Sequence, residues 1–143
     1  MTYTGSQLVE KIKNLNLPLD KCLAVGGSSL AIRGMRETRD LDIVVLPEVF
    51  EMLQKEGWVL DSEYESRWNR KRLKRDDVEI YPDLFLETAD RYLNVEDLLK
   101  NADIVEGIHV QDLENLILCK LDSAREKDLK DVTLIQEYLR SEG

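Results

Sequence analysis

Two aspartates, Asp40 and Asp42, flank the first residue of the apolar run LDIVVL at residues 41–46. Side chains two positions apart on a strand point to the same side of the sheet, with their α-carbons roughly 6–7 Å apart. Carboxylates at that spacing repel each other unless a cation lies between them. Mg²⁺ is commonly held by one or two carboxylates together with substrate phosphates. The pair therefore predicts a divalent-metal site, although an isolated Asp-x-Asp is more often only a charged strand end.

A turn of small residues precedes this pair, and twelve residues separate its second glycine from Asp40. The turn follows the apolar run CLAV and opens a predicted helix, so free backbone N–H groups and the positive end of the helix dipole face the same cleft. Glycine lets a phosphate approach the backbone, and a serine hydroxyl can donate to a phosphate oxygen. The turn therefore predicts a triphosphate site, formed by Gly26, Gly27, Ser28 and Ser29.

A third carboxylate, Glu79, stands between two apolar residues in the run Val78-Glu79-Ile80. An acid in that setting is expected to project from a buried strand toward a site. With Asp40 and Asp42 it would complete a two-metal centre, in which Glu79 is a metal ligand or the base for an attacking hydroxyl. Asp83 stays an alternative, because a slip of one residue in register would turn Glu79 away from the site.

The three pieces resemble, in order and spacing, the pattern of the nucleotidyltransferase superfamily of DNA polymerase β-like fold. That pattern is an apolar residue with Gly-[Gly/Ser], then Asp-apolar-[Asp/Glu]-apolar, and later apolar-[Asp/Glu]-apolar. The stretches GGSSLAIRGMRETRDLDIVV and ENLILCKLDSAREKDLKDV are similar to small prokaryotic nucleotidyltransferases that include AbiEii-type abortive-infection toxins and minimal nucleotidyltransferase antitoxins. The resemblance extends over residues 20–140, nearly the whole chain.

The resemblance also implies roles for basic residues outside the three pieces. A lysine on the penultimate helix and an Arg-x-Lys-Asp segment recur in this group, and they match Lys120 and residues 125–128. Lys120 and Lys127 would then reach the triphosphate, with Asp128 holding one of them. In the alternative interpretation, Lys120 only extends from a core helix to solvent and Asp128 only caps the last helix. Arg33, Arg36 and Arg39 lie between the turn and Asp40, where arginines or neighbouring polar residues of this family can face the nucleotide. The alternative for Arg39 is pairing with a local acid.

The function implied by the resemblance is Mg²⁺-dependent transfer of a nucleoside monophosphate from a nucleoside triphosphate to a hydroxyl, with release of pyrophosphate. Two Mg²⁺ ions are expected, with Mn²⁺ as a possible substitute. The acceptor would be RNA such as tRNA, a protein or a small molecule. The alternative is a toxin–antitoxin component that acts mainly by binding a partner protein. The sequence names neither the base, the acceptor nor the oligomeric state.

Charge and hydropathy narrow the class of protein. The formal net charge of −9 argues against a general nucleic-acid-binding protein. Six basic residues nevertheless gather in RWNRKRLKR at residues 67–75, as a solvated face or as a contact for a phosphate or an anionic acceptor. No apolar run is long enough to suggest a membrane span, and the N-terminal stretch lacks the pattern of a secretory signal. The expected location is the cytoplasm, without a membrane partner.

The apolar periodicity predicts a mixed α/β (α+β) fold, with a β-sheet flanked by helices. The resemblance implies that this is the nucleotidyltransferase fold. One domain is expected over residues 1–143, with a catalytic sheet core at 1–88 and a mainly helical part at 89–143. Helices are predicted at 5–16 with Ser6 as the N-cap, 28–33, 47–57, 94–102, 112–124 and 127–142, strands at 22–26, 41–46, 58–60, 65–73 and 77–81, and a hairpin at 102–111.

Overall fold

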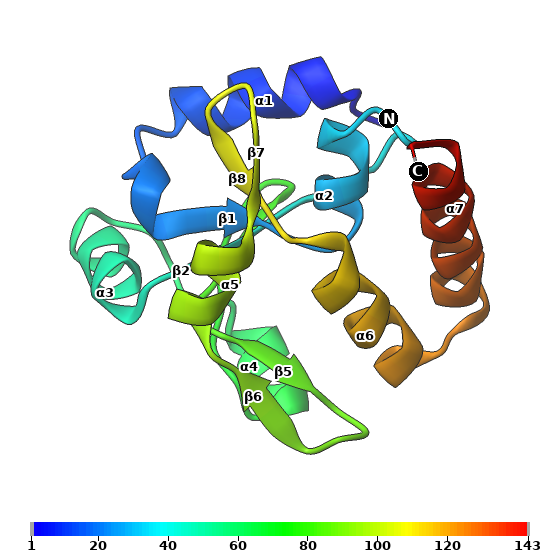
Figure 1. Ribbon diagram of the computed structural model, residues 1–143. Coiled ribbons are helices and arrows are strands. Elements are labelled where there is room, and N and C mark those ends of the chain that lie inside the picture. Colours follow the sequence, from blue (N-terminus) through cyan, green and yellow to red (C-terminus); the bar gives the residue numbers. More distant parts are fainter. Residues whose placement is uncertain (1, 143) are drawn as a thin grey trace.

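Helices and strands alternate along the first half of the chain, and the computed structural model describes residues 2–142 (Figure 1). The helices are α1 (Gly5–Asn14), α2 (Gly27–Ile32), α3 (Pro47–Lys55), α4 (Ser62–Trp68), α5 (Val95–Asn101), α6 (Leu113–Ser123) and α7 (Glu126–Glu142), with a 3₁₀ turn, η1 (Leu19–Lys21). The strands are β1 (Cys22–Ala24), β2 (Leu41–Val45), β3 (Leu73–Arg75), β4 (Val78–Tyr81), β5 (Leu84–Leu86), β6 (Arg91–Leu93), β7 (Asp103–Val105) and β8 (Ile108–Val110). This is the mixed α/β class that the sequence predicts.

Six of these strands form one mixed sheet in the order β3-β4-β2-β1-β8-β7. The central strands β1 and β2 are antiparallel, whereas β2 pairs with β4, and β1 with β8, in parallel. The strands β7 and β8 come from the hairpin predicted at residues 102–111, so that prediction is confirmed. The sheet therefore extends beyond residues 1–88 and takes two strands from the part that was expected to be mainly helical.

Alternation along the central strands separates two apolar layers. Leu41, Ile43 and Val45 pack with α1 and α3 on one face of the sheet. Val44 packs on the other face, with Leu98 of α5 among its neighbours. Since side chains on a strand alternate between faces, Asp42 shares the face of Val44, opposite α1 (Figure 1). The candidate site therefore lies on the α5 side of the sheet.

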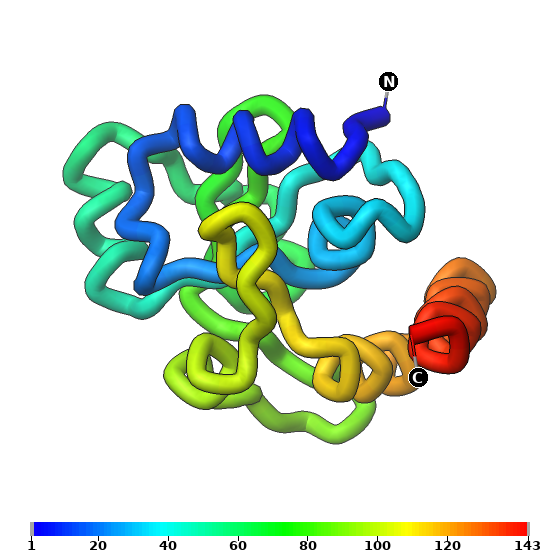
Figure 2. Tube along the Cα trace, turned by 45° about the horizontal axis from the view of Figure 1, so that its top comes forward, coloured from blue at the N-terminus to red at the C-terminus, as the bar shows by residue number. Residues whose placement is uncertain are grey.

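Helices α6 and α7 pack against each other beside the sheet, as Figures 1 and 2 show. A small buried cluster joins both of them to α2 through Leu30, Leu116 and Ile135. The end of α6 turns into α7 through Ala124, which adopts a left-handed conformation with φ of 50°. This packing holds the two C-terminal helices next to the glycine turn from which α2 begins.

Three local expectations were wrong. Residues 65–73 were expected to form a strand, but α4 occupies Ser62–Trp68, and Asp61 caps it by accepting a hydrogen bond from the backbone N–H of Tyr64. Of the strand expected at 58–60, only an isolated bridge between Leu60 and Leu73 forms. Thr4, not Ser6, is the N-cap of α1, and it forms a capping box with Gln7.

The hairpin of β5 and β6 was not expected from the sequence, which indicated mainly helix after Pro82. Its strands are only three residues long, too short for a clear alternation of apolar and polar residues. Phe85 and Tyr92 pack across this hairpin with their ring centroids 4.7 Å apart. Phe85 of this hairpin also lines a cavity beside Asp42.

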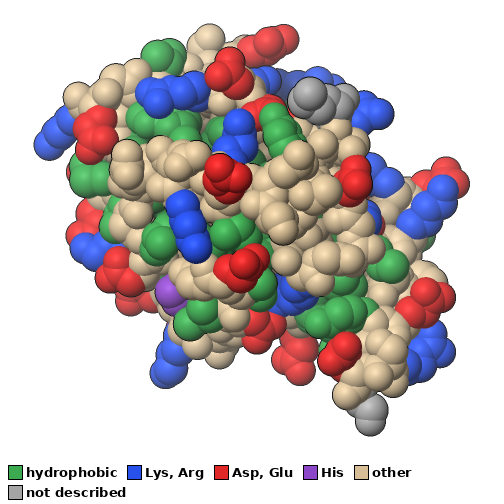
Figure 3. Space-filling view, turned by 90° about the horizontal axis from the view of Figure 1, so that it is seen from above, with side chains coloured by type: hydrophobic (Ala, Val, Ile, Leu, Met, Phe, Trp, Pro, Cys, Tyr) green, Lys and Arg blue, Asp and Glu red, His purple; other side chains and the backbone are tan. Residues whose placement is uncertain are grey.

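Charged side chains of both signs are intermixed on the face seen from above α1 (Figure 3). The net charge of −9 is therefore not gathered into a patch of one sign on that face. No helix within residues 2–142 has both the length and the apolar content needed to cross a membrane.

Close packing of α1 on α2 makes Gly5 sensitive to substitution. A methyl group at Gly5 would lie 2.4 Å from the carbonyl oxygen of Ala31, in the backbone of α2, where no flexible side chain can move away. We expect Gly5→Ala to lower the free energy of unfolding by about 1–3 kcal/mol, despite the better helix propensity of alanine. Urea unfolding measures the change. Ser6→Ala, at the adjacent exposed position, is the matched control, and equal stability of the two variants would contradict this packing.

Candidate functional site

The two aspartates are held in place by the buried side chain of Ser28. Its hydroxyl donates to the carbonyl oxygen of Asp40 at 3.1 Å and accepts from the backbone N–H of Asp42 at 2.9 Å. The first turn of α2 is thereby joined to the beginning of β2. Asp40 and Asp42 both line one cavity.

Register between neighbouring strands brings the third predicted carboxylate to the pair. β2 and β4 are parallel, and Asp42 is the direct partner of Glu79. Glu79 lies on the same face as Asp42, while its neighbours Val78 and Ile80 are buried on the α1 side. Asp83 follows the end of β4 and lines a cavity on the far side from Asp40. It is therefore Glu79, and not Asp83, that is the strand neighbour of Asp42.

Asp42 has an unusual electrostatic environment. Burial raises the pKa of its carboxyl to about 7, and the nearby charge of Glu79 adds to the effect. One of its oxygens, Oδ1, is buried and has no hydrogen-bond partner within the described residues. A buried carboxylate oxygen without a partner is costly unless a proton or a cation occupies its lone pairs. Asp42 is thus the acid in this site that most needs a proton or a cation.

Glu79 already has a positive partner. Arg72 donates from Nη1 to Oε2 of Glu79 at 2.8 Å, and the hydroxyl of Tyr81 donates to the same oxygen at 2.8 Å. Arg72 also binds Asp61 with two nitrogens, at 2.9 and 2.8 Å, and lies over the ring of Tyr64. This network holds Glu79 beside Asp42. It comes from the basic run at residues 67–75, so part of that run pairs with carboxylates of the protein itself.

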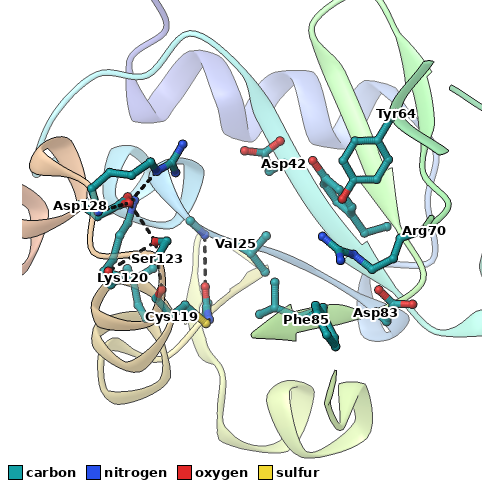
Figure 4. A pocket seen from close by; sticks show the side chains of 16 residues that line it. Val25, Asp42, Tyr64, Arg70, Asp83, Phe85, Cys119, Lys120, Ser123 and Asp128 are labelled. Atoms are coloured by element: carbon teal, nitrogen blue, oxygen red, sulfur yellow. Dashed lines mark hydrogen bonds and ion pairs between the residues drawn. The ribbon is translucent and has the colours of Figure 1, made fainter. Parts of the chain in front are cut away.

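Two cavities meet at Asp42. The first, of about 250 Å³, has apolar, aromatic and charged residues in its walls, with Lys120, Ser123 and Asp128 on one side and Tyr64, Arg70 and Phe85 on the other (Figure 4). The second, of about 780 Å³, is lined by the glycine turn, by the segment before β2 and by α7. The residues that line both cavities are Gly26, Asp42, Lys120 and Arg125. A ligand that filled both would pass directly over Asp42.

The second cavity concentrates positive charge in an acidic protein. Its basic lining residues are Arg36, Arg39, Lys120, Arg125, Lys127 and Lys130, and its acidic ones are Glu37, Asp40, Asp42 and Asp131. Asp128 and Glu126, outside this lining, pair with Lys120, Arg125 and Lys130. Arg39 and Lys127 form no ion pair within residues 2–142, so their positive charge is left for an anion in the cavity.

Lys120 is fixed at the edge between the two cavities by two acids of α7. Its Nζ lies 2.9 Å from Asp131 and 3.3 Å from Asp128. The expectation that Asp128 holds one of the lysines is therefore confirmed. Asp128 is buried and also accepts from Ser123 and Arg125, and these hydrogen bonds lower the pKa of its carboxyl to about 2 although burial acts the other way. Asp128 stays ionised, so Lys120 keeps a fixed position.

The four residues of the glycine turn are placed differently from one another. Gly26 has φ of 59° and ψ of −136°, a conformation open to glycine, and its N–H donates to Oε1 of Gln111 at 3.1 Å. Gly27 faces the second cavity. Ser28 and Ser29 are fully buried, and Ser29 donates to the carbonyl oxygen of Gln111. Their hydroxyls therefore hold the protein together, and only the backbone of the turn can reach a ligand.

Sequence reasoning treated Arg36 only in passing and missed Gln111. Arg36 binds Asp131 with two hydrogen bonds, and Gln111 connects the glycine turn to the sulfur of Cys119. Neither pairing is visible in local spacing, because Asp131 is 95 residues from Arg36 and Gln111 is 85 residues from Gly26 in the chain.

The two other predicted basic residues, Arg39 and Lys127, are exposed at the cavity, and Arg39 forms no ion pair within residues 2–142.

Across the described part of the chain, no three His, Cys, Asp or Glu side chains are arranged as a ready-made metal cluster. Asp40, Asp42 and Glu79 are brought to one region, but Glu79 is paired with Arg72. Models of protein families, curated protein sequences and solved structures give no match to this chain.

Proposed function

We propose that the protein is a nucleotidyltransferase of the DNA polymerase β-like fold. It would transfer a nucleoside monophosphate from a nucleoside triphosphate to a hydroxyl group and release pyrophosphate. The observation that carries this proposal is the buried carboxylate of Asp42, which has an oxygen without a hydrogen-bond partner among residues 2–142 and lies where the two cavities meet. The order of glycine turn, Asp-x-Asp and third carboxylate supports it, because the register pairs Asp42 with Glu79.

The donor set fits a hard divalent cation such as Mg²⁺ between Asp40 and Asp42. Both are oxygen donors, Asp42 has a free buried oxygen, and the backbone around both is held by Ser28. A bound Mg²⁺ would polarise a phosphate oxygen and neutralise charge that develops during transfer. The expectation of a second ion stays a prediction, since Glu79 would have to share its oxygens with Arg72.

The residues of this chain would act mainly by position and charge, which is how phosphoryl groups are transferred in general. The basic cavity would take the triphosphate, with Gly27 offering its backbone and Lys120 a fixed positive charge. Arg39 and Lys127, at the open side of that cavity, would make further contacts with the phosphates. The 250 Å³ cavity on the other side of Asp42 would receive the acceptor, so that its hydroxyl meets the phosphate at Asp42.

A second candidate function is binding of a partner protein, as a toxin–antitoxin component. Four leucines of α6 and α7 favour it, because 40–51% of each side chain is exposed: Leu118, Leu121, Leu129 and Leu139. These leucines lie on the helices that carry Lys120 and Asp131, so a partner bound there would be close to the basic cavity. The same partner could be the acceptor.

Calorimetry and label transfer together test the proposed transferase. Each nucleoside triphosphate is titrated into the protein with Mg²⁺ and, separately, with EDTA. We expect binding of at least one triphosphate that is lost in EDTA. Each α-³²P-labelled triphosphate is then incubated with the protein, Mg²⁺ and either total tRNA or a co-purified partner, and label is expected on a macromolecule.

Absence of Mg²⁺-dependent binding of every triphosphate would overturn the transferase proposal and favour partner binding. Binding without label transfer to RNA, protein or a panel of small hydroxyl compounds would reduce the protein to a nucleotide-binding module. Label that appears equally in EDTA would contradict the assignment of a cation to Asp40 and Asp42.

A further inference from the structure

The guanidinium group of Arg36 is held at the glycine turn by an acid of α7. Nε and Nη2 donate to the two carboxylate oxygens of Asp131, each at 2.9 Å, and Nη1 donates to the carbonyl oxygen of Glu37 at 2.8 Å. Asp131 is buried, and hydrogen bonds from Arg36 and Lys120 lower the pKa of its carboxyl although burial alone would raise it. The acid therefore stays charged, and it fixes the plane and direction of the guanidinium.

Two donors of Arg36 remain available. A guanidinium carries five N–H bonds, and three of those of Arg36 have the partners just described, which leaves one on Nη1 and one on Nη2. The side chain is about one-third exposed and faces the 780 Å³ cavity. N–H donors fixed on a planar cation bind phosphate oxygens in a set direction, which the rotating ammonium of a lysine cannot do.

The lack of a side chain at Gly27 is explained by this guanidinium. A methyl group at Gly27 would lie 2.9 Å from Nη2 and 3.3 Å from Nη1 of Arg36, so the two nitrogens with free donors lie against this glycine. Gly27 was expected to allow a phosphate close to the backbone. The short distances show that Gly27 also leaves room for Arg36, and both residues line the cavity that Asp40 lines.

We infer that Arg36 is a phosphate-binding residue, which grips the phosphate chain of a nucleoside triphosphate with its two free N–H groups. Asp131 is the residue that positions Arg36, and the absence of a side chain at Gly27 leaves room for the guanidinium. Lys120 shares Asp131 with Arg36, so the same carboxylate sets the relative position of two cations in the cavity. This inference rests on the proposed function, because it assigns a residue to the phosphates of that substrate.

Calorimetry with Mg²⁺-ATP, Mg²⁺-pyrophosphate and AMP tests the role of Arg36. Charge-assisted hydrogen bonds are worth about 1.5–3 kcal/mol, so we expect Arg36→Gln to weaken the binding of ATP and pyrophosphate by about ten- to a hundredfold. AMP, which lacks the outer phosphates, should lose much less affinity. Arg36→Lys should recover little, because lysine keeps the charge but not the paired donors. Arg140→Gln, at an exposed position near the end of α7, is the control and should bind as the parent does.

A second variant covers the case in which loss of the Arg36–Asp131 pair disturbs the fold. Gly27→Ala keeps every charge but displaces the end of Arg36, and Gly27 has no positive φ to strain. We expect it to weaken pyrophosphate binding with little change in Tm. If Arg36→Gln and Gly27→Ala both bind ATP and pyrophosphate as the parent does, Arg36 is not a phosphate-binding residue, while the proposed function stands. If the parent itself binds no triphosphate and no pyrophosphate, both proposals fail.

Discussion

Replacing Asp42 with asparagine is expected to reduce label transfer by about a thousandfold or more and to abolish Mg²⁺-dependent binding of the triphosphate. Asparagine keeps the shape of the side chain but removes the charge that would hold the cation. The backbone N–H of residue 42 can still donate to Ser28, so the strand should stay in place. Transfer by Asp42→Asn at the parent's rate would show that the metal is bound elsewhere.

The same substitution is expected to stabilise the protein at alkaline pH when no divalent cation is present. The pKa of Asp42 rises from the ordinary 3.8 to about 7 on folding, so between these values the folded protein binds more protons than the unfolded chain. The free energy of unfolding therefore falls as the pH rises through this window, and asparagine removes that part of the fall.

Urea unfolding in EDTA at pH 5 and pH 8 measures this effect. Asp42→Asn should exceed the parent in stability at pH 8, and the difference should narrow at pH 5. Asp40→Asn is the matched control, because Asp40 is exposed and its removal should change stability little. If the difference in free energy of unfolding between Asp42→Asn and the parent is the same at both pH values, the carboxyl of Asp42 is not buried and unpaired as described.

Replacing Arg72 with methionine should produce the largest loss of stability among the substitutions considered. Arg72 joins Asp61, Glu79 and the hydroxyl of Tyr81, and the ion-paired side chains are only 13–17% exposed. Methionine fills similar apolar volume but leaves two carboxylates without their cation. Removing one partner of a largely buried ion pair costs about 3 kcal/mol or more.

Loss of Arg72 should also weaken the site itself. The positive charge of Arg72 opposes the rise in the pKa of Asp42, so without it Asp42 holds its proton to higher pH. We therefore expect Mg²⁺-dependent triphosphate binding to shift to more alkaline pH in calorimetry. Adding Glu79→Gln to Arg72→Met should restore part of the stability, since the amide needs no cation. Arg67→Met, on the exposed side of α4, is the control, and an equal loss of stability in both single variants would refute the network.

The central part of the site was predictable from the sequence because it depends on local pattern. Two of the local patterns, the Asp-x-Asp at the start of an apolar run and the acid between apolar neighbours, indicate which side of a strand a residue faces. The small-residue turn indicates where a strand ends and a helix begins. The pairing of Asp42 with Glu79 then follows from the register of two adjacent strands. These inferences need only the alternation of side chains and a correct order of strands.

The rest depended on contacts between distant parts of the chain. The basic run at 67–75 shows no pattern that would indicate pairing of Arg72 with Asp61 and Glu79, and the start of that run is helical because Asp61 caps α4. The buried positions of the Ser28 and Ser29 hydroxyls were equally hidden. A serine after a glycine turn has the same spacing whether its hydroxyl meets a ligand or the backbone of a neighbouring strand.

The parallel pairing of β1 with β8 determines when the site can form during folding. The glycine turn takes its hydrogen-bonded form only when Gln111 arrives, and 85 residues separate this glutamine from Gly26. Contacts over such a separation form late, because a long loop must close first. During synthesis on the ribosome, the turn and the Asp-x-Asp strand therefore emerge long before the segment that shapes them. The glycine turn of a nascent chain therefore takes its final form only once the last third of the chain has been made.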